Sequence, residues 1–158
     1  MAVLSKTFFH VAVVVPRLDE ALEHLSGVLG AQWGPTTEIG VAVAGPDGGG
    51  GRHVPLRFAY SVEPPYFEVI EEAPGSVWVC NPNSNLHHVG YWAEGLIAER
   101  DRLVASACPI EIAGFAGEPP EPAMYTYHAD PLGIRVELVD AALRPMMEAA
   151  LAEGRAMV

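Results

Sequence analysis

Residues 8–30 read FFHVAVVVPRLDEALEHLSGVLG and join a strand pattern to a helix pattern. The first eight residues are β-branched or aromatic apart from His10 and Ala12, and they stop at Pro16, which is typical of a β-strand. Leucines at positions 18, 22, 25 and 29 then recur at helical spacing, and a glycine follows the last of them. The stretch therefore predicts a strand followed by an amphipathic helix.

The same pattern restarts at residue 86, where LHHVGYW predicts another strand with a helix after it. In the first half we predict strands at 8–15, 39–44, 55–61 and 66–71 and a helix at 18–29. In the second half we predict strands at 86–92, 110–115, 124–128 and 134–139 and a helix at 95–107. Placing His10 on His88 also aligns Leu18 with Leu96, so the order strand-helix-strand-strand-strand indicates a duplicated module.

A chain of 158 residues has the length of one compact domain. We predict an α+β fold in a single domain over residues 1–140, built from a βαβββ module at 7–72 and a second one at 86–140. A C-terminal helix is expected in residues 141–158. The glycine-rich segment 45–51 is expected to be a mobile loop.

The charge of the chain disfavours some classes of binding partner. The chain has 158 residues with 20 acidic and 9 basic side chains, a formal charge of -11 and a single lysine. Nucleic-acid binding needs a basic face, so we expect no nucleic-acid partner. The same shortage disfavours anionic membranes and highly phosphorylated ligands.

The longest strongly apolar run, 11–15, is too short to span a bilayer, and the N-terminus has no secretory signal pattern. We expect a cytoplasmic protein with reduced cysteines and no membrane contact.

Polar side chains interrupt four of the expected strands. Side chains alternate between the two faces of a strand, and in each of these strands the polar residue lies on the face opposite to the side expected to be covered by a helix. The four residues are His10, Glu68, His88 and Glu137. If the two halves of the sheet curl together, these side chains converge inside a trough.

Two imidazoles and two carboxylates suit one divalent ion, such as Zn, Ni, Co, Mn or Fe(II), and the carboxylates would balance its charge. Each residue by itself has a plainer interpretation. A lone histidine in a strand is more often a hydrogen-bonded core residue, Glu68 could be exposed, and Glu137 could pair with Arg135. An ionised glutamate buried alone is costly, however, and the shared face favours a metal site.

Three motifs fall on these strands: HVAVVV at 10–15 followed by Leu18-Asp19, HVG at 88–90, and DPLGIRVEL at 130–138. The last is the most specific. Together they resemble the vicinal oxygen chelate superfamily, the glyoxalase/bleomycin resistance/dioxygenase fold, over roughly residues 7–140. The resemblance implies paired βαβββ modules that form a cupped mixed sheet around a metal site. The positions that match the superfamily's metal ligands are His10, Glu68, His88 and Glu137.

The ligand set distinguishes branches of this superfamily. A His/Glu/His/Glu set is typical of glyoxalase I, whereas methylmalonyl-CoA epimerases usually carry Gln where Glu68 stands. The shortage of Lys and Arg further disfavours CoA or glutathione. The resemblance to the glyoxalase-like or epimerase-like branch implies a metal-dependent isomerase, epimerase or lyase that acts on a small carbonyl substrate. Glu68 or Glu137 would move the α-proton as general base, and the metal would stabilise the enolate.

Two other functions stay open at this point. A ring-cleaving Fe(II) dioxygenase would use His10, His88 and Glu137, and Tyr127 stands where such enzymes often place a tyrosine, but the fourth ligand, Glu68, counts against it. A protein that sequesters small molecules without turnover would hold flat aromatic ligands in the same trough, where an acidic chain suits a cation. The side chains expected to line a substrate pocket are Trp92, Tyr66, Tyr125, Tyr127 and Arg135.

We also predict a homodimer, the commonest oligomer. Each module is expected to expose a sheet edge, and unpaired edges favour association. An apolar stripe with helical spacing near the C-terminus has no evident role within the modules. Its residues are Met146, Met147, Ala150 and Leu151. All four proposed ligands occur in one chain, so each chain is expected to hold its own ion.

Overall fold

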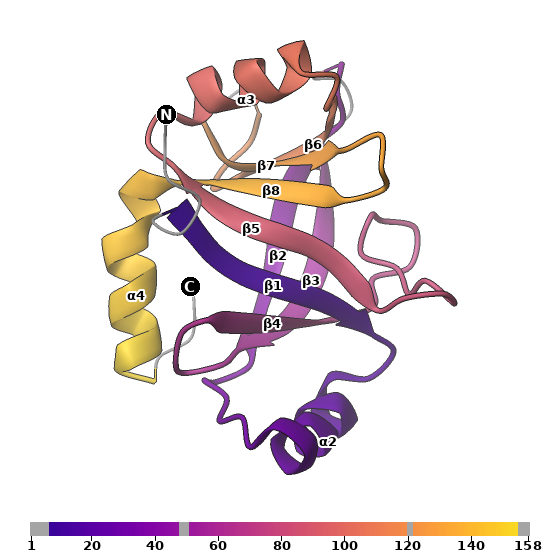
Figure 1. The fold of residues 1–158 in the computed structure, drawn as a ribbon, viewed down its shortest axis with the longest axis vertical. Coiled ribbons are helices and arrows are strands. Elements are labelled where there is room, and N and C mark those ends of the chain that lie inside the picture. The colour runs from indigo at the N-terminus through magenta and orange to yellow at the C-terminus, as the bar shows by residue number, and fades with distance from the viewer. Residues whose placement is uncertain (1–6, 48–50, 120–121, 155–158) are drawn as a thin grey trace. The chain divides into compact units, whose positions relative to one another are not determined.

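The computed structural model describes residues 7–47, 51–119 and 122–154, which are drawn in colour in Figure 1. Within them the chain has an α+β fold with eight strands, three α-helices and one short 3-10 helix. The elements are β1 (Phe8–Val15), α2 (Leu18–Leu29), β2 (Thr37–Ala44), β3 (Arg52–Tyr60), β4 (Tyr66–Glu71), β5 (Leu86–Ala93), α3 (Leu96–Ala105), β6 (Ile110–Phe115), β7 (Ala123–Ala129), β8 (Arg135–Asp140), η1 (Ala141–Leu143) and α4 (Arg144–Ala152). The predicted β-α-β-β-β order is therefore confirmed twice. The predicted loop at 45–51 lies partly outside the described residues.

β1, α2, β4 and β6 begin and end where the sequence pattern predicts. Among the strands, β3 differs most from its predicted bounds, because it begins at Arg52 and not at residue 55. The alternation of buried and more exposed residues that is typical of a strand begins earlier than expected. Val54, Leu56 and Phe58 are all buried, while the residues between them are less buried. Pro55 stands inside this strand at an exposed position.

The C-terminal helix is shorter than predicted and has two parts. The Asp140 side chain accepts a hydrogen bond of 2.9 Å from the Ala142 N–H, which opens the 3-10 turn η1. α4 follows with Pro145 in its first turn, where a missing N–H is tolerated. The helix ends at Ala152, and Gly154 has φ 63°; residues 155–158 lie outside the described part. None of the helices described is long and apolar enough to cross a membrane.

The strand order is β1-β4-β3-β2-β6-β7-β8-β5, and this order closes on itself. Within each module the first strand pairs in parallel with the last: β1 with β4, and β5 with β8. β2–β6, β3–β4, β6–β7 and β7–β8 pair antiparallel. Each of the two parallel pairs places a strand that carries a histidine, β1 or β5, beside a strand that carries a glutamate, β4 or β8.

The chain divides into two compact units that alternate along the sequence. The first, here called the His10 unit, comprises the described parts of residues 10–40, 55–87 and 145–158. The second, the His88 unit, comprises the described parts of residues 1–9, 41–54 and 88–144.

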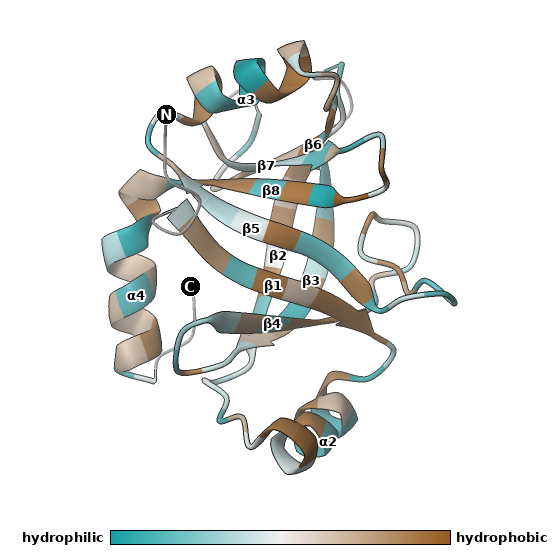
Figure 2. Cartoon of the chain, viewed as in Figure 1, coloured by the Kyte–Doolittle hydropathy of each residue, from teal (hydrophilic) through white to brown (hydrophobic). Residues whose placement is uncertain are grey.

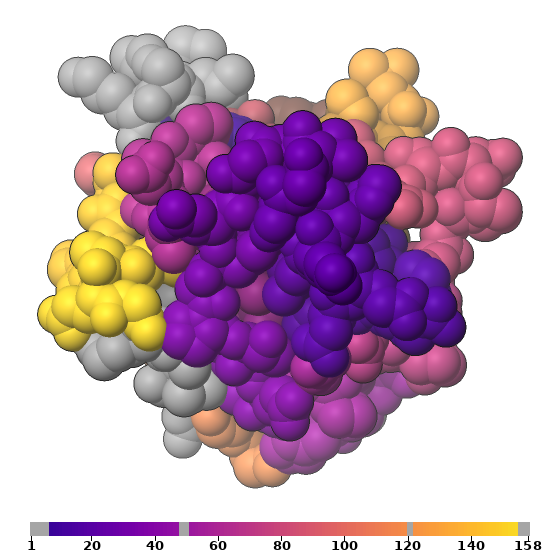
Figure 3. Space-filling view, turned by 90° about the horizontal axis from the view of Figure 1, so that it is seen from below, coloured from indigo at the N-terminus to yellow at the C-terminus, as the bar shows by residue number. Residues whose placement is uncertain are grey.

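In the His10 unit, α2 covers one face of the β1–β4 pair (Figure 1). Val15, Leu18 and Val69 form the centre of this core, and Trp33 packs beside them with its Nε1–H donating to Ser26 Oγ at 2.9 Å. Brown apolar residues follow one side of α2 in Figure 2, as its leucine spacing predicts. The other side of α2 faces solvent, in indigo in Figure 3.

The His88 unit repeats this arrangement with α3. Ala93, Leu96 and Leu138 form its core, with Leu103 and Val136 packed against them. The apolar face of β8 is thus directed at the helix, as predicted, although Ile134 precedes the strand and is exposed. In both units the opposite face of the paired strands is the one that carries the polar residues.

Candidate metal centre

The first half of the candidate centre is a histidine and a glutamate on neighbouring parallel strands. In the β1–β4 register, Ala12 is opposite Glu68, so the glutamate stands two residues beyond His10. His10 Nε2 lies 3.3 Å from Glu68 Oε2. The imidazole is 0% exposed and the carboxylate side chain 9%. The strand pairing therefore brings two ligand-type groups together in an almost dry environment.

The second half repeats this geometry in the His88 unit. Gly90 is opposite Glu137 in the β5–β8 register, so this glutamate also stands two residues beyond its histidine. His88 Nε2 lies 3.4 Å from Glu137 Oε2, and the two side chains are again 0% and 9% exposed. The duplicated offset, distance and burial match the duplication seen in the sequence.

These distances test whether the residues fit a metal ion. A charge-assisted N–H···O hydrogen bond is shorter, at about 2.7–2.9 Å. Two ligands that are each about 2.1 Å from one ion lie about 3.0–3.4 Å apart in octahedral or tetrahedral geometry. The observed separations of 3.3 and 3.4 Å fall in the second range.

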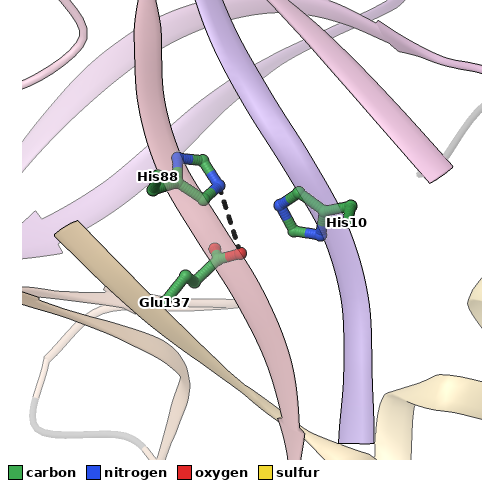
Figure 4. A group of neighbouring side chains, drawn as sticks. All are labelled: His10, His88 and Glu137. Carbon is green, nitrogen blue, oxygen red and sulfur yellow. Dashed lines mark ion pairs between the residues drawn. The ribbon is translucent and has the colours of Figure 1, made fainter. Parts of the chain in front are cut away.

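Three of the four groups form one close set, shown in Figure 4. His10, His88 and Glu137 each offer one ligand atom, and these atoms lie within 4.8 Å of one another. The dashed line in Figure 4 marks the His88–Glu137 pair. Imidazole nitrogens and a carboxylate oxygen are donors for Zn, Fe(II), Ni, Co or Mn, so the donor set fits a divalent ion.

A tyrosine accompanies each pair. Tyr60 on β3 is opposite Glu68 in the sheet, and its ring lies edge-on to His10 with centroids 5.4 Å apart. Tyr127 on β7 is opposite Glu137, and its ring lies 4.8 Å from that of His88. The sequence reasoning selected Tyr127 and missed Tyr60. The signal that could have found it is its place in the strand before Glu68, which matches that of Tyr127 before Glu137.

The other predicted pocket residues have varied surroundings. Trp92 is buried, stacks on Phe9 at 4.0 Å and lies beneath the Arg144 guanidinium. Tyr125 is half-buried, 5.5 Å from Tyr127. Tyr66 is half-buried and is opposite His10 in the sheet.

Arg135 makes a two-pronged ion pair with Glu111, at 2.6 and 2.9 Å. Arg135 thus pairs with Glu111, and Glu137 pairs with His88.

Four further histidines lie apart from the two pairs, and three of them are ones for which the sequence predicts no ligand role: His24, His53 and His87. His87 is buried on the other face of β5, with Nε2 2.8 Å from the Val77 carbonyl. His24 is exposed on α2. His53 is exposed and pairs with Glu118 at 2.7 Å.

His128 is a buried histidine that the sequence reasoning did not single out. Its Nδ1 lies 3.0 Å from the Cys108 carbonyl, and its Nε2 lies 3.0 Å from Thr126 Oγ1. Burial lowers the pKa of His128, so the neutral imidazole is favoured. Side chains alternate between the two faces of β7, so His128 lies on the other face of this strand from its neighbour Tyr127. It therefore points to the helix-facing side of the sheet and not to the candidate metal centre.

The two cysteines are poorly suited to act as nucleophiles. Burial raises the pKa of the Cys80 thiol, and the nearby Glu72 raises it further. Burial also raises the pKa of Cys108. A nucleophilic cysteine needs the opposite shift, toward thiolate.

Comparison with known proteins identifies the fold family. The family model described as the glyoxalase/bleomycin resistance protein/dioxygenase superfamily matches residues 9–127, more than half of the chain. The chain belongs to this superfamily. No curated protein matches the sequence significantly.

Solved structures of methylmalonyl-CoA epimerases have the same fold at low sequence identity. A methylmalonyl-CoA epimerase in complex with methylmalonyl-CoA and NH4+ has a TM-score of 0.55 and 16% identity over 86% of this chain and 94% of its own. A variant Streptomyces coelicolor methylmalonyl-CoA epimerase bound to 2-nitronate-propionyl-CoA has a TM-score of 0.56 and 17% identity, covering 86% and 97%. The Mycobacterium tuberculosis methylmalonyl-CoA epimerase has a TM-score of 0.51 and 18% identity, covering 89% and 91%.

Proposed function

We propose that the protein is a metal-dependent lyase or isomerase, including epimerases, that transfers the α-proton of a small carbonyl substrate. The observation that carries the proposal is the duplicated His–Glu pair, with the same register offset, nearly equal N···O distance and equal burial in each unit. In this proposal all four side chains serve one divalent ion. Superfamily membership supports it, because the superfamily's description includes glyoxalases.

A divalent ion held by these residues would supply electrostatic stabilisation of negative charge on the substrate's carbonyl oxygen. The chain's own residues then have separate tasks. His10 and His88 act as neutral donors that position the site. A carboxylate with little exposure to water can take a proton from the carbon next to a carbonyl as a general base.

We assign proton transfer to Glu68 and permanent ligation to Glu137. Glu137 belongs to the three-residue set whose ligand atoms lie within 4.8 Å of one another, whereas Glu68 is placed by its contact with His10. Glu137 would therefore hold the ion, and Glu68, at the edge of the ligand set, would accept the α-proton.

The test is metal content and solvent-proton exchange in matched variants. We expect about one divalent ion per chain after loading with Zn, Ni, Co, Mn or Fe(II), measured by elemental analysis. Glu137→Gln should lose at least about tenfold in metal affinity. Glu68→Gln should keep most of the ion but lose exchange of a bound substrate's α-proton for deuterium.

Glu94→Gln is the control, because Glu94 is exposed after β5 and should change neither property. No bound ion under any loading condition would overturn the proposed function and favour a binding protein without turnover. Equal metal loss in both site variants would overturn the division of roles between the two glutamates.

A second candidate is a ring-cleaving Fe(II) dioxygenase. Two observations favour it: the close set of His10, His88 and Glu137 is a two-histidine-one-carboxylate group, and Tyr127 lies against His88. Anaerobic Fe(II) loading followed by a panel of catechols separates the two functions. Oxygen uptake with a coloured ring-cleavage product supports the dioxygenase, and its absence across the panel supports proton transfer.

A further inference from the structure

We propose that the site takes a small, uncharged carbonyl compound with an aromatic or other apolar substituent, and not a CoA thioester or a similarly anionic carrier. The inference rests on the proposed function and names its substrate class. It follows from the groups that contact the histidines and from the partners of the arginines.

Aromatic rings are the neighbours of His10. Tyr60 lies edge-on to the imidazole at 5.4 Å and 87°, and Phe58 lies edge-on to Tyr60 at 5.9 Å and 88°. Both rings are buried, and both belong to β3. A substrate group that reaches His10 from this side therefore meets π-surfaces, which favour apolar and aromatic groups.

His88 has the same kind of neighbour. Tyr127 lies 4.8 Å away, and Tyr125 follows at 5.5 Å from Tyr127. Tyr125 also fills the space above Gly114, where a Cβ would come within 2.1 Å of its ring. Glycine at this position leaves room for the Tyr125 ring against the neighbouring strand. The absence of a side chain at Gly114 therefore allows an aromatic ring on the His88 side of the site.

Binding of CoA would require cations for its phosphates. In the His10 unit, Arg17 pairs with Glu20. Arg57 is shared by three carboxylates, with Nη2 2.8 Å from Asp19, Nε 2.9 Å from Glu38 and Nη1 3.0 Å from Glu71. A phosphate at Arg57 would have to displace carboxylates that stay nearby and repel it.

The arginines of the His88 unit are engaged in the same way. The pairs are Arg100–Asp101, Arg102–Glu99 and Arg135–Glu111, with Arg144 over the Trp92 ring. Arg52 also has an interaction partner. Every arginine in residues 7–47, 51–119 and 122–154 is thus already partnered, in a chain whose formal charge is -11. A tetra-anionic carrier would meet net repulsion on approach.

The charge of the candidate site points in the same direction. Two glutamates neutralise a divalent ion, so the filled site carries no net charge. A neutral substrate keeps this balance until proton transfer creates negative charge beside the ion, whereas an anionic substrate would add uncompensated charge to a nearly dry site. The substrate class that fits is therefore an uncharged hydroxycarbonyl or dicarbonyl.

The experiment compares ligands on metal-loaded protein by calorimetry. Acetohydroxamate and benzohydroxamate share one chelating group and differ only in the substituent; propionyl-CoA represents the anionic carrier. We expect benzohydroxamate to bind at least about tenfold more tightly than acetohydroxamate, as burial of a phenyl group allows. Propionyl-CoA should not compete with benzohydroxamate at low ionic strength, where charge effects are strongest.

Variants separate ring contacts from other effects. Tyr60→Ala or Tyr127→Ala should reduce the preference for benzohydroxamate toward that for acetohydroxamate, while Tyr60→Phe and Tyr127→Phe should preserve it. Metal content measured on the same samples shows that the centre is intact. Equal affinities for the two hydroxamates, or tighter binding of propionyl-CoA, would overturn the inference and leave the proposed function standing. Failure to take up metal would overturn both.

Discussion

His10 and His88 occupy corresponding places in the two modules, and each is fully buried beside a glutamate. Removing an ionised carboxylate from water is expensive unless a counter-charge accompanies it. A neutral imidazole offers a carboxylate a hydrogen bond but no counter-charge, whereas a divalent ion would supply counter-charge for both glutamates at once. The burial of the four side chains is therefore a physical argument for metal binding that does not depend on family resemblance.

His128 gives a residue-level prediction about pH. Burial is the main cause of its lowered pKa; Arg100 lowers it further, and the hydrogen bond that the imidazole donates to the Cys108 carbonyl opposes the shift. The unfolded chain takes up a proton near the ordinary value of 6.5, while the folded chain does so only at lower pH. The free energy of unfolding should therefore fall as the pH drops below about 6.5, by about 1.4 kcal/mol for each unit between the two pKa values.

Urea unfolding from pH 8 to pH 5 measures this effect, with His128→Asn compared to the natural chain. The variant keeps a neutral hydrogen-bonding side chain and should show a smaller loss of stability on acidification. The same substitution at the exposed His24 controls for the loss of a histidine as such. Parallel pH profiles for His128→Asn and the natural chain would contradict the prediction.

At the scale of elements, the two covering helices end in the same backbone conformation with different residues. Gly30 has φ 68° after α2, and its N–H donates to the Ser26 carbonyl at 3.0 Å. Ala107 has φ 62° after α3, and the next N–H, that of Cys108, donates to the Leu103 carbonyl at 3.0 Å. Glycine adopts this left-handed conformation freely, but a residue with a Cβ does so at a cost.

Replacing alanine by glycine at position 107 and glycine by alanine at position 30 should therefore change the free energy of unfolding in opposite directions. Ala107→Gly should raise the free energy of unfolding by about 0.5–1 kcal/mol, and Gly30→Ala should lower it by about 1 kcal/mol. A Cβ at Gly30 would have no neighbour within 4 Å, so its cost is one of backbone conformation alone. Urea unfolding of both variants is the measurement. A destabilised Ala107→Gly protein would mean that packing of the Ala107 methyl group outweighs the backbone strain.

The start of α2 is held by a strand residue and not by its own N-cap. Arg17, at the N-cap, makes no side-chain capping bond. Glu71, at the end of β4, accepts a hydrogen bond of 2.8 Å from the Leu18 N–H and pairs with Arg57 on β3. A carboxylate at a helix N-terminus also complements the helix dipole. This contact joins α2 to the same parallel strand pair that carries His10 and Glu68, and so helps to set their position.

At the scale of the whole molecule, two of the reasons for expecting a dimer have changed. The strand order closes within one chain, so the argument from unpaired sheet edges does not apply. Ala150 and Leu151 of the C-terminal stripe are buried within the chain itself, whereas Met146 is 55% exposed. The homodimer remains a prediction, and it now depends on exposed apolar side chains such as Met146.

Light scattering at micromolar concentration tests the dimer, with twice 16.9 kDa expected. Met146→Glu should dissociate the dimer if α4 forms the interface, because burial of a charge there is unfavourable. Ile97→Glu, at an exposed apolar position on α3, is the matched control. A species of 16.9 kDa for the natural chain would contradict the dimer. A dimer that survives Met146→Glu would place the interface elsewhere.

Local pattern was enough to predict the repeated element order and the polar face of four strands. Alternation along a strand depends only on backbone geometry, so the faces of His10, Glu68, His88 and Glu137 could be read from their apolar neighbours. The leucine spacing of α2 depends on helix geometry in the same way. These features arise from residues that are close together in the sequence.

Tertiary structure alone decided the pairings between distant residues. The register that sets Tyr60 opposite Glu68, the partnership of Arg135 with Glu111, and the contact of His128 with the Cys108 carbonyl each join different elements. The closed strand order also removed the free edges that the sequence suggested. Such pairings depend on how complete strands and helices pack together, because one shift in register moves every side chain of a strand to the other face. No local pattern contains that information.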